Sequence, residues 1–166
     1  MSPNTSLKAQ LRDAQTLVEN YVGFDSPADR KATDEAVRKK LNAAVSDLFL
    51  HVVSLEHYLA RSGMDELRTL AAGQVQKFQD LLDKIQSSPY AFSPFFTYDQ
   101  VDESAQSLVM EKDLALLRTL DRVMELLGVT LRPESDFQSI LETTEVLAED
   151  MDKELEARIN AIMEYS

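Results

Sequence analysis

The chain has 166 residues and a formal net charge of −12, and 44% of its residues are hydrophobic. This length and apolar fraction suit one domain with a buried core. The apolar fraction is too high for an intrinsically disordered protein. Because the chain contains no cysteine, disulfides, thiolate metal sites and a cysteine nucleophile are excluded as well.

The negative charge is concentrated in the second half of the chain. Residues 1–98 carry 11 basic and 12 acidic side chains, whereas residues 99–166 carry 6 basic and 17 acidic ones. An acidic surface does not suit binding to nucleic-acid phosphates or to anionic membranes. The sequence also shows no secretory signal and no apolar run long enough to span a membrane, so we expect a soluble, cytoplasmic protein.

Apolar residues recur every three or four positions along most of the chain, and no segment alternates with the period of two that strands show. The pattern predicts an all-α fold, an antiparallel four-helix bundle with coiled-coil-like packing and an additional N-terminal amphipathic helix. We expect residues 1–166 to form one helical domain. Its predicted parts are an N-terminal helix (4–22), a first helical hairpin (27–86), a connector (87–98) and a second helical hairpin (99–165).

The first two helices have recognisable start and stop signals. The polar run 4–6 can cap the first helix, which ends near Gly23. Ser26 and Pro27 suit the N-cap and first position of the second helix, and Gly63 suits its end. At ~1.5 Å per residue the second helix is about 50 Å long. The second helix is therefore longer than the third helix that packs on it, and we expect the first helix or another subunit to cover the part of the second helix that the third does not reach.

The connector between the hairpins combines two prolines with five of the twelve Tyr and Phe residues. Its aromatic residues are Tyr90, Phe92, Phe95, Phe96 and Tyr98. Connectors are normally polar and exposed, whereas rigid exposed rings are typical of binding hot spots. We name all five as candidate partner-binding residues, with packing onto the end of the bundle and a small-molecule pocket as alternatives.

The second hairpin contains two candidate capping boxes, in which a hydroxyl and a Gln side chain satisfy backbone N–H groups. Thr97 with Gln100 would start the fourth helix, and Gly128 would end it. Ser135 with Gln138 would start the last helix.

An acidic ridge follows one side of the last helix at intervals of three and four residues. Its members are Glu142, Glu145, Glu149, Asp152 and Glu156. Like charges at these spacings destabilise a helix, so we expect compensation, and the basic run 38–40 is the densest source within the chain. A basic partner protein, divalent cations, and simple solvation with screening by salt are the alternatives.

Catalytic chemistry has few candidate residues in this sequence. The only histidines, His51 and His57, lie on one predicted helix, and no Glu-x-x-His motif is present, which argues against a ferritin-like di-iron site. No Gly-rich phosphate loop or Ser-His-Asp arrangement is apparent. Two alternatives remain: a metal-dependent enzyme or ligand-binding bundle that uses the acidic ridge, and a phosphorelay-type module with an exposed His57.

The sequence therefore favours a non-catalytic protein–protein interaction module: an adaptor, a regulator or a small subunit of a larger assembly. We expect no cofactor and no metal site. The expected partner is another protein, a basic one where the acidic ridge takes part, and self-association into a homo-oligomer is the alternative.

Overall fold

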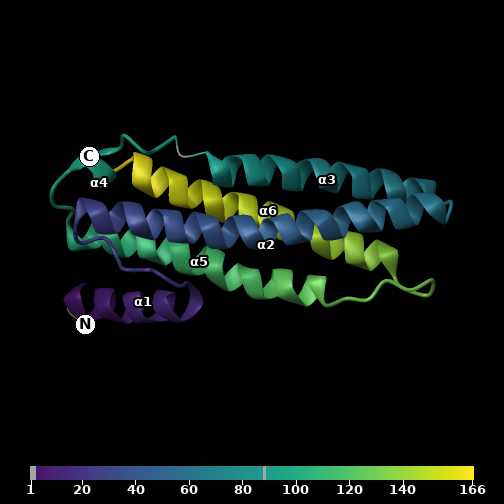
Figure 1. The fold of residues 1–166 in the computed structure, drawn as a ribbon, viewed down its shortest axis with the longest axis horizontal. Helices are drawn as coiled ribbons and strands as arrows, with labels where there is room; N and C mark the ends of the chain where they lie inside the picture. Colours follow the sequence, from purple (N-terminus) through teal and green to yellow (C-terminus); the bar gives the residue numbers. More distant parts are fainter. Residues whose placement is uncertain (1–2, 88) are drawn as a thin grey trace.

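The computed structural model describes residues 3–87 and 89–166, without the side chains of residues 3–5 (Figure 1). Ser88, part of the predicted connector, lies outside the described residues, as do the side chains of Asn4 and Thr5. The described residues are all-helical and contain no β-strand, as the sequence predicts. The helices are α1 (Pro3–Leu17), α2 (Pro27–Arg61), α3 (Asp65–Gln86), α4 (Pro94–Thr97), α5 (Glu103–Leu127) and α6 (Phe137–Met163).

The four long helices lie side by side, as two helical hairpins. α2 packs against α3, and α5 packs against α6, while α2 also contacts α5 and α3 contacts α6. Within each hairpin the helices are antiparallel, but between the hairpins they run parallel (Figure 1). In the α3–α6 contact, Lys77 pairs with Glu145 and Lys84 pairs with Asp152, so both helices advance in the same direction. The connector therefore crosses one end of the molecule from α3 to α5.

The turn between α2 and α3 follows from its glycine. Gly63 adopts a φ of 71°, a left-handed conformation that favours glycine. Its N–H donates to Ala60 O at 3.2 Å, and the N–H of Met64 donates to Leu59 O at 3.0 Å. These two bonds form a Schellman motif, and the predicted end of the second helix is confirmed.

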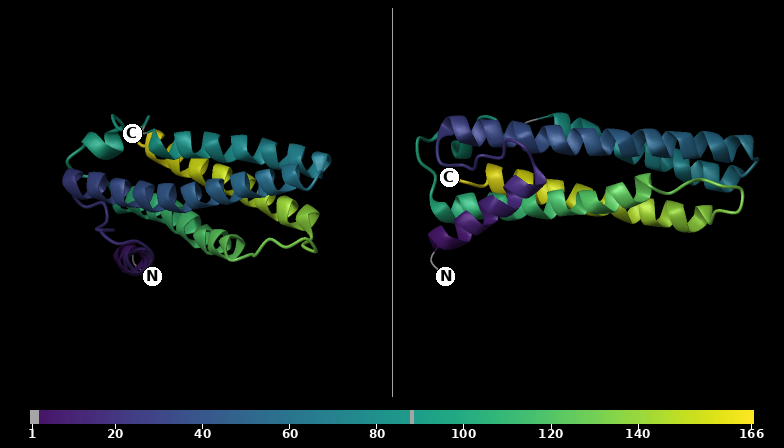
Figure 2. Two further views of the ribbon diagram at one scale, coloured as in Figure 1. Left: turned by 45° about the vertical axis from the view of Figure 1, so that its right-hand side comes forward. Right: turned by 60° about the horizontal axis from the view of Figure 1, so that its bottom comes forward.

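The first helix is shorter than predicted, because it ends at Leu17 rather than near residue 22. The chain turns at Asn20, whose φ is 68°, and the turn directs Tyr21 and Phe24 into the core, where each is 1% exposed. α1 itself lies across the outer face of α5 (Figure 2).

Both predicted capping boxes are wrong. Pro94 starts the short α4, so Thr97 ends that helix, and α5 begins only after Asp102. At α6 the N-cap is Asp136, whose carboxylate accepts a hydrogen bond from Ser139 N at 3.0 Å. The Ser135 hydroxyl instead accepts a hydrogen bond from Arg132 N within the preceding turn.

The core extends along the whole set of long helices. One cluster of buried side chains joins all of them with α1 and the connector, and a smaller one fills the end near the α2–α3 turn. The expectation that the first helix covers the part of α2 beyond α3 is wrong, because α1 packs on α5 and the short α4 contacts both α2 and α6 there. None of the described helices combines the length and the apolar character needed to cross a membrane.

Candidate interaction site at the connector end

The connector is fixed to the bundle through α4. Ser93 is the N-cap of this helix, and its hydroxyl accepts a hydrogen bond from Phe95 N at 3.2 Å. The same hydroxyl donates to Ile162 O of α6 at 2.7 Å. One side chain therefore caps α4 and ties the connector to the last turn of α6.

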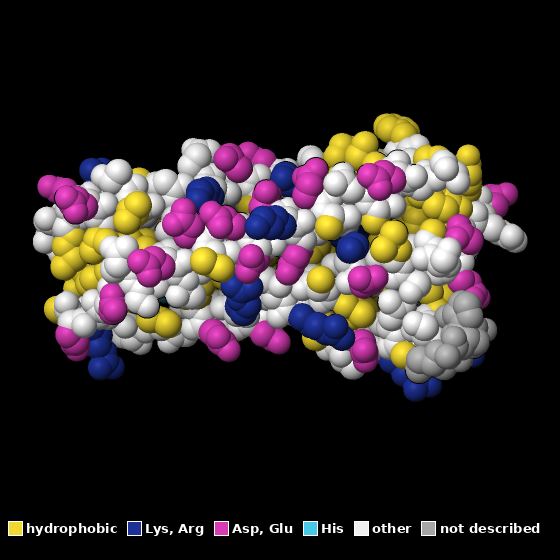
Figure 3. Space-filling model, turned by 180° about the vertical axis from the view of Figure 1, so that it is seen from behind, with side chains coloured by type: hydrophobic (Ala, Val, Ile, Leu, Met, Phe, Trp, Pro, Cys, Tyr) yellow, Lys and Arg dark blue, Asp and Glu magenta, His cyan; other side chains and the backbone are white. Residues whose placement is uncertain are grey.

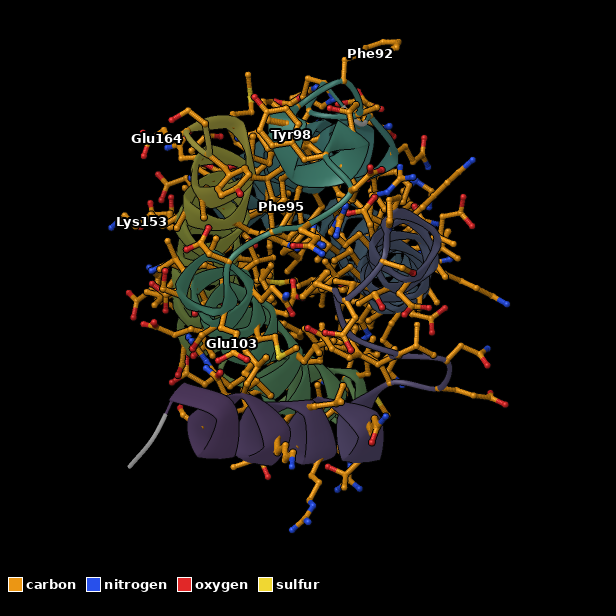
Figure 4. All side chains as sticks on the ribbon, turned by 90° about the vertical axis from the view of Figure 1, so that its left-hand side faces the viewer. Phe92, Phe95, Tyr98, Glu103, Lys153 and Glu164 are labelled. Atoms are coloured by element: carbon orange, nitrogen blue, oxygen red, sulfur yellow. The ribbon has the colours of Figure 1, made fainter. Side chains whose placement is uncertain are left out.

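The five aromatic residues of the connector fall into two groups. Tyr90 and Phe95 are 3% and 0% exposed, and Phe96 is half-buried against the same core. By contrast, Phe92 is 92% exposed and Tyr98 is 49% exposed. Figure 4 shows Phe92 pointing away from the bundle while Phe95 points into it. Three of the candidate rings thus have packing roles within the chain, and two present surface to solvent.

Ring-to-ring contacts hold the buried group in place. Phe95 meets Phe24 at a centroid distance of 5.3 Å and Phe96 at 5.2 Å, both edge to face. Phe96 in turn stacks on Tyr90 at 5.7 Å. Each such pair stabilises a fold by about 0.5–1.5 kcal/mol beyond the area it buries, so contacts within the chain fix the positions of Tyr90, Phe95 and Phe96.

Beneath the connector lies a buried polar network that joins five segments of the chain. The Tyr90 hydroxyl donates to Asp34 Oδ1 at 2.8 Å and accepts from Arg158 Nη1 at 3.1 Å. Arg158 also donates to Asp34 Oδ1 at 2.9 Å and, through Nε, to Asp113. The Tyr21 hydroxyl donates to Asp113 Oδ2 at 2.6 Å. The five residues come from α2, α5, α6, the connector and the loop after α1.

The charged members of this network are stable in the interior only because they are paired. Asp34, Asp113 and Arg158 are 5%, 0% and 0% exposed, and an unpaired charge at such depth costs several kcal/mol. Arg38 supplies a second cation, with Nε 3.1 Å from Asp34 Oδ2. Burial raises the pKa of Asp113, and the nearby Arg158 guanidinium opposes that effect.

The same environment changes the acidity of the two tyrosines. Burial and, to a smaller extent, the Asp34 carboxylate raise the pKa of Tyr90 to about 12, against the opposing effect of Arg158. Burial and the Asp113 carboxylate raise the pKa of Tyr21 further. Both hydroxyls therefore stay protonated and donate to the carboxylates at neutral pH.

This network is not among the sites predicted from the sequence, although the sequence contains a signal for it. Asp34 lies three residues before Val37, in phase with the apolar positions of α2, and Arg158 lies three residues after Leu155 in the same relation to α6. A charged residue on the apolar face of a helix predicts a buried charge that needs a partner.

Arg30 fixes the position of Tyr98. It is fully buried, and its guanidinium donates to Phe24 O at 3.1 Å and to Tyr98 O. These bonds hold the loop after α1 and the end of the connector against the start of α2. The Tyr98 side chain is therefore partly exposed, while its backbone is held in place by Arg30.

A groove of about 460 Å³ opens between the start of α2 and the connector. Its walls combine small apolar side chains, two aromatic rings and a charged rim, and they include two members of the buried network, Asp34 and Tyr90. The lining residues are Pro27, Ala28, Lys31, Asp34, Glu35, Arg38, Tyr90, Ala91 and Phe96.

Seen from behind, apolar surface gathers at both ends of the molecule, with charges of both signs between them (Figure 3).

The acidic ridge lies along the α3–α6 contact, and α3 supplies its cations. The pairs are Lys77 with Glu145 (2.8 Å) and Glu149 (3.9 Å), and Lys84 with Asp152 (2.7 Å) and Glu156 (3.1 Å). Glu142 accepts a hydrogen bond from Gln138 of its own helix at 3.0 Å. The expectation that the basic run 38–40 compensates the ridge is wrong, because that run lies on α2, where Arg38 pairs with Asp34.

The ridge carboxylates do not converge on an interior cavity. The four that pair with lysines are roughly half exposed, so each pair stabilises the fold by about 1 kcal/mol or less. Among the described residues, no three acidic or histidine side chains are arranged to hold a metal ion.

His57 is exposed on α2, with its Nε2 3.5 Å from Glu56. His51 is half-buried, and burial lowers its pKa.

Comparison of the chain with protein-family models, with curated proteins and with solved structures gave no match.

Proposed function

We propose that this chain is a non-catalytic protein-interaction module that binds another protein at the connector end. The observation that carries the proposal is the position of Phe92, which is 92% exposed between two buried aromatic residues, Tyr90 and Phe95. A partner that covers this ring removes apolar area from water, which favours association. Because the neighbouring backbone is already anchored, little conformational entropy is lost on binding.

The surroundings of Phe92 have the composition of a binding hot spot. Tyr98 offers a second half-exposed ring, and Ala91, the residue before Phe92, lines the groove beside α2. Aromatic anchors next to a pocket contribute most of the binding energy in many interfaces. The binding of a basic partner by the acidic ridge stays a prediction, and the proposal does not depend on it.

Photo-crosslinking tests the proposal. A benzoylphenylalanine residue replaces Phe92 in one variant and Met124, 64% exposed on α5, in the control. After irradiation in cells that naturally express the chain, position 92 should yield a discrete adduct with another protein or with a second copy. Position 124 should not, and the additional change Tyr98→Ser should reduce the yield from position 92.

Absence of an adduct at position 92, or the same adducts at both positions, would overturn the proposal. The variant Phe92→Ser supplies the folding control. Because the ring is exposed, its loss should change the unfolding free energy by less than about 0.5 kcal/mol.

A further inference from the structure

The groove beside the connector differs in charge from the rest of the molecule. Residues 27–42, at the start of α2, carry five basic and three acidic side chains, of which Arg30 and Asp34 are buried, whereas the whole chain has a net charge of −12. Lys31 and Arg38 line the groove, and Lys39 lines the surface hollow that adjoins it. Exposed lysines therefore gather beside the groove, whereas the excess of negative charge lies in residues 99–166.

The negative groups of the groove are largely committed within the chain. Asp34 accepts hydrogen bonds at Oδ1 from Tyr90 and Arg158, and at Oδ2 from Arg38. Its carboxylate is thus neutralised from inside the bundle. Because Arg38 is paired with Asp34, the lining is left with one acidic side chain, Glu35, and one further cation, Lys31. Along the described part of the chain, no ion pair occupies Lys31 or Lys39, and both are exposed.

The remaining lining is apolar and is fixed in shape. Pro27 and Ala28 form one wall at the first turn of α2, where the Ser26 side chain caps the helix. Ala91 and Phe96 form the other wall, and Phe96 is held by its contacts with neighbouring rings. Such a space takes one large apolar side chain, while charges along the rim select what flanks it.

We propose that this groove binds an acidic segment of the partner protein that carries one large apolar side chain. The apolar side chain enters between Phe96 and the first turn of α2, and flanking carboxylates pair with Lys31 and Lys39. The inference rests on the proposed function and specifies it further, because it defines the chemistry of the partner. It places the basic groups on this chain and the acidic groups on the partner.

Selection from random peptides displayed on phage, with the purified full chain as bait, tests the inference. The selected sequences should contain Asp and Glu around one large apolar position. A synthetic peptide of the consensus sequence is then titrated against the chain by fluorescence anisotropy. Its affinity should fall by about tenfold or more, ~1.4 kcal/mol, in Lys31→Glu and in Ala28→Trp, which fills the groove. It should also weaken as salt concentration rises.

Matched controls separate the groove from general charge effects. Lys153→Glu makes the same change in charge at an exposed position on α6, away from α2 (Figure 4), and should leave the affinity unchanged. A basic consensus, no consensus, or equal effects of Lys31→Glu and Lys153→Glu would overturn the inference. If Phe92→Ser weakens binding of the consensus peptide but Lys31→Glu and Ala28→Trp do not, the proposed function stands and the acidic-segment inference fails. If the consensus peptide binds the groove but position 92 gives no adduct, the proposed function is what fails.

Discussion

Tyr90 belongs both to the connector and to the buried network, and its two ends have different roles. Its ring stacks on Phe96 and forms part of the groove, while its hydroxyl reaches Asp34 and Arg158. This amphipathic side chain anchors the proposed partner-binding surface to the rigid interior of the bundle. A binding surface on a connector requires an anchor of this kind, because a loose aromatic loop would lose entropy on association.

The raised pKa of Tyr90 predicts a loss of stability in alkaline solution. The folded-state pKa is about 12, whereas an unfolded chain has about 10. The unfolded state therefore releases the proton first, and the free energy of unfolding falls as pH rises from about 10 through about 12. At pH ~11 the loss that Tyr90 causes is about 1.4 kcal/mol.

Urea unfolding of the wild type and of Tyr90→Phe at pH ~9 and pH ~11, at equal ionic strength, measures this loss. The phenylalanine variant starts less stable because it lacks the hydrogen bond to Asp34, but its stability should fall less between the two pH values. Equal pH dependence in the two proteins would show that Tyr90 has an ordinary pKa. Tyr21, which is present in both, cancels in the comparison.

At the scale of whole helices, the sequence predicts most of the fold. The apolar spacing and the Gly and Pro positions identify each long helix, because local propensity and packing agree there. The errors occur at helix ends, where tertiary contacts decide. The first helix ends early because Tyr21 must reach Asp113, and the predicted cap at Thr97 fails because Pro94 starts a separate turn.

The candidate site could be predicted from the sequence only in part. Aromatic clustering identified the connector, but which rings face the core depends on distant partners such as Phe24 and Ile162. The cations of the acidic ridge were assigned to the wrong helix, since Lys77 and Lys84 become neighbours of the ridge only when α3 runs parallel to α6. Helix-to-helix register of this kind is not encoded in local spacing.

Two glycines of the first hairpin give opposite predictions for the same substitution. Gly63 has a φ of 71° at the end of α2, and an added Cβ there meets no atom within 4 Å, so the cost of Gly63→Ala is purely one of backbone conformation. We expect a loss of about 1 kcal/mol. Gly73 lies exposed inside α3 with equally open surroundings. Gly73→Ala should increase stability by about 0.5–1 kcal/mol, because alanine favours helix.

Thermal or urea unfolding of the two variants beside the wild type measures both effects. Because each substitution adds the same methyl group into open space, any difference of sign comes from the backbone. Stabilisation by Gly63→Ala would contradict the left-handed turn between α2 and α3.

For the molecule as a whole, the parallel packing of the two hairpins requires a feature that holds them in register. The apolar contacts between α2 and α5 and between α3 and α6 are not directional, whereas the buried network is. Arg158 of α6 binds Asp113 within its own hairpin and Asp34 across the hairpin boundary. We expect this network to align the hairpins and the connector and thereby to keep the interaction surface in one geometry.

The cost of removing Arg158 tests this view. Arg158→Leu leaves two carboxylates in the interior without their shared cation, and loss of one partner from a buried ion pair costs about 3–5 kcal/mol. Arg118→Leu is the matched control: Arg118 is an exposed arginine whose nearest carboxylate, Asp13, lies 3.6 Å away. Its loss should cost at most about 1 kcal/mol. Urea unfolding followed by circular dichroism measures both changes.

A second substitution keeps the test informative if Arg158→Leu is too unstable to purify. Adding Asp113→Leu removes one of the two carboxylates that lost Arg158 as a partner. The double variant should therefore recover part of the lost stability, and the effects of the two substitutions on the free energy of unfolding should not add. If Asp113→Leu instead lowers stability further by its full single-variant cost, Arg158 and Asp113 act independently. The Arg158–Asp113 contact would then contribute nothing to the packing of α6 against α5, and the alignment of the hairpins would rest on the Arg158–Asp34 contact and on apolar packing.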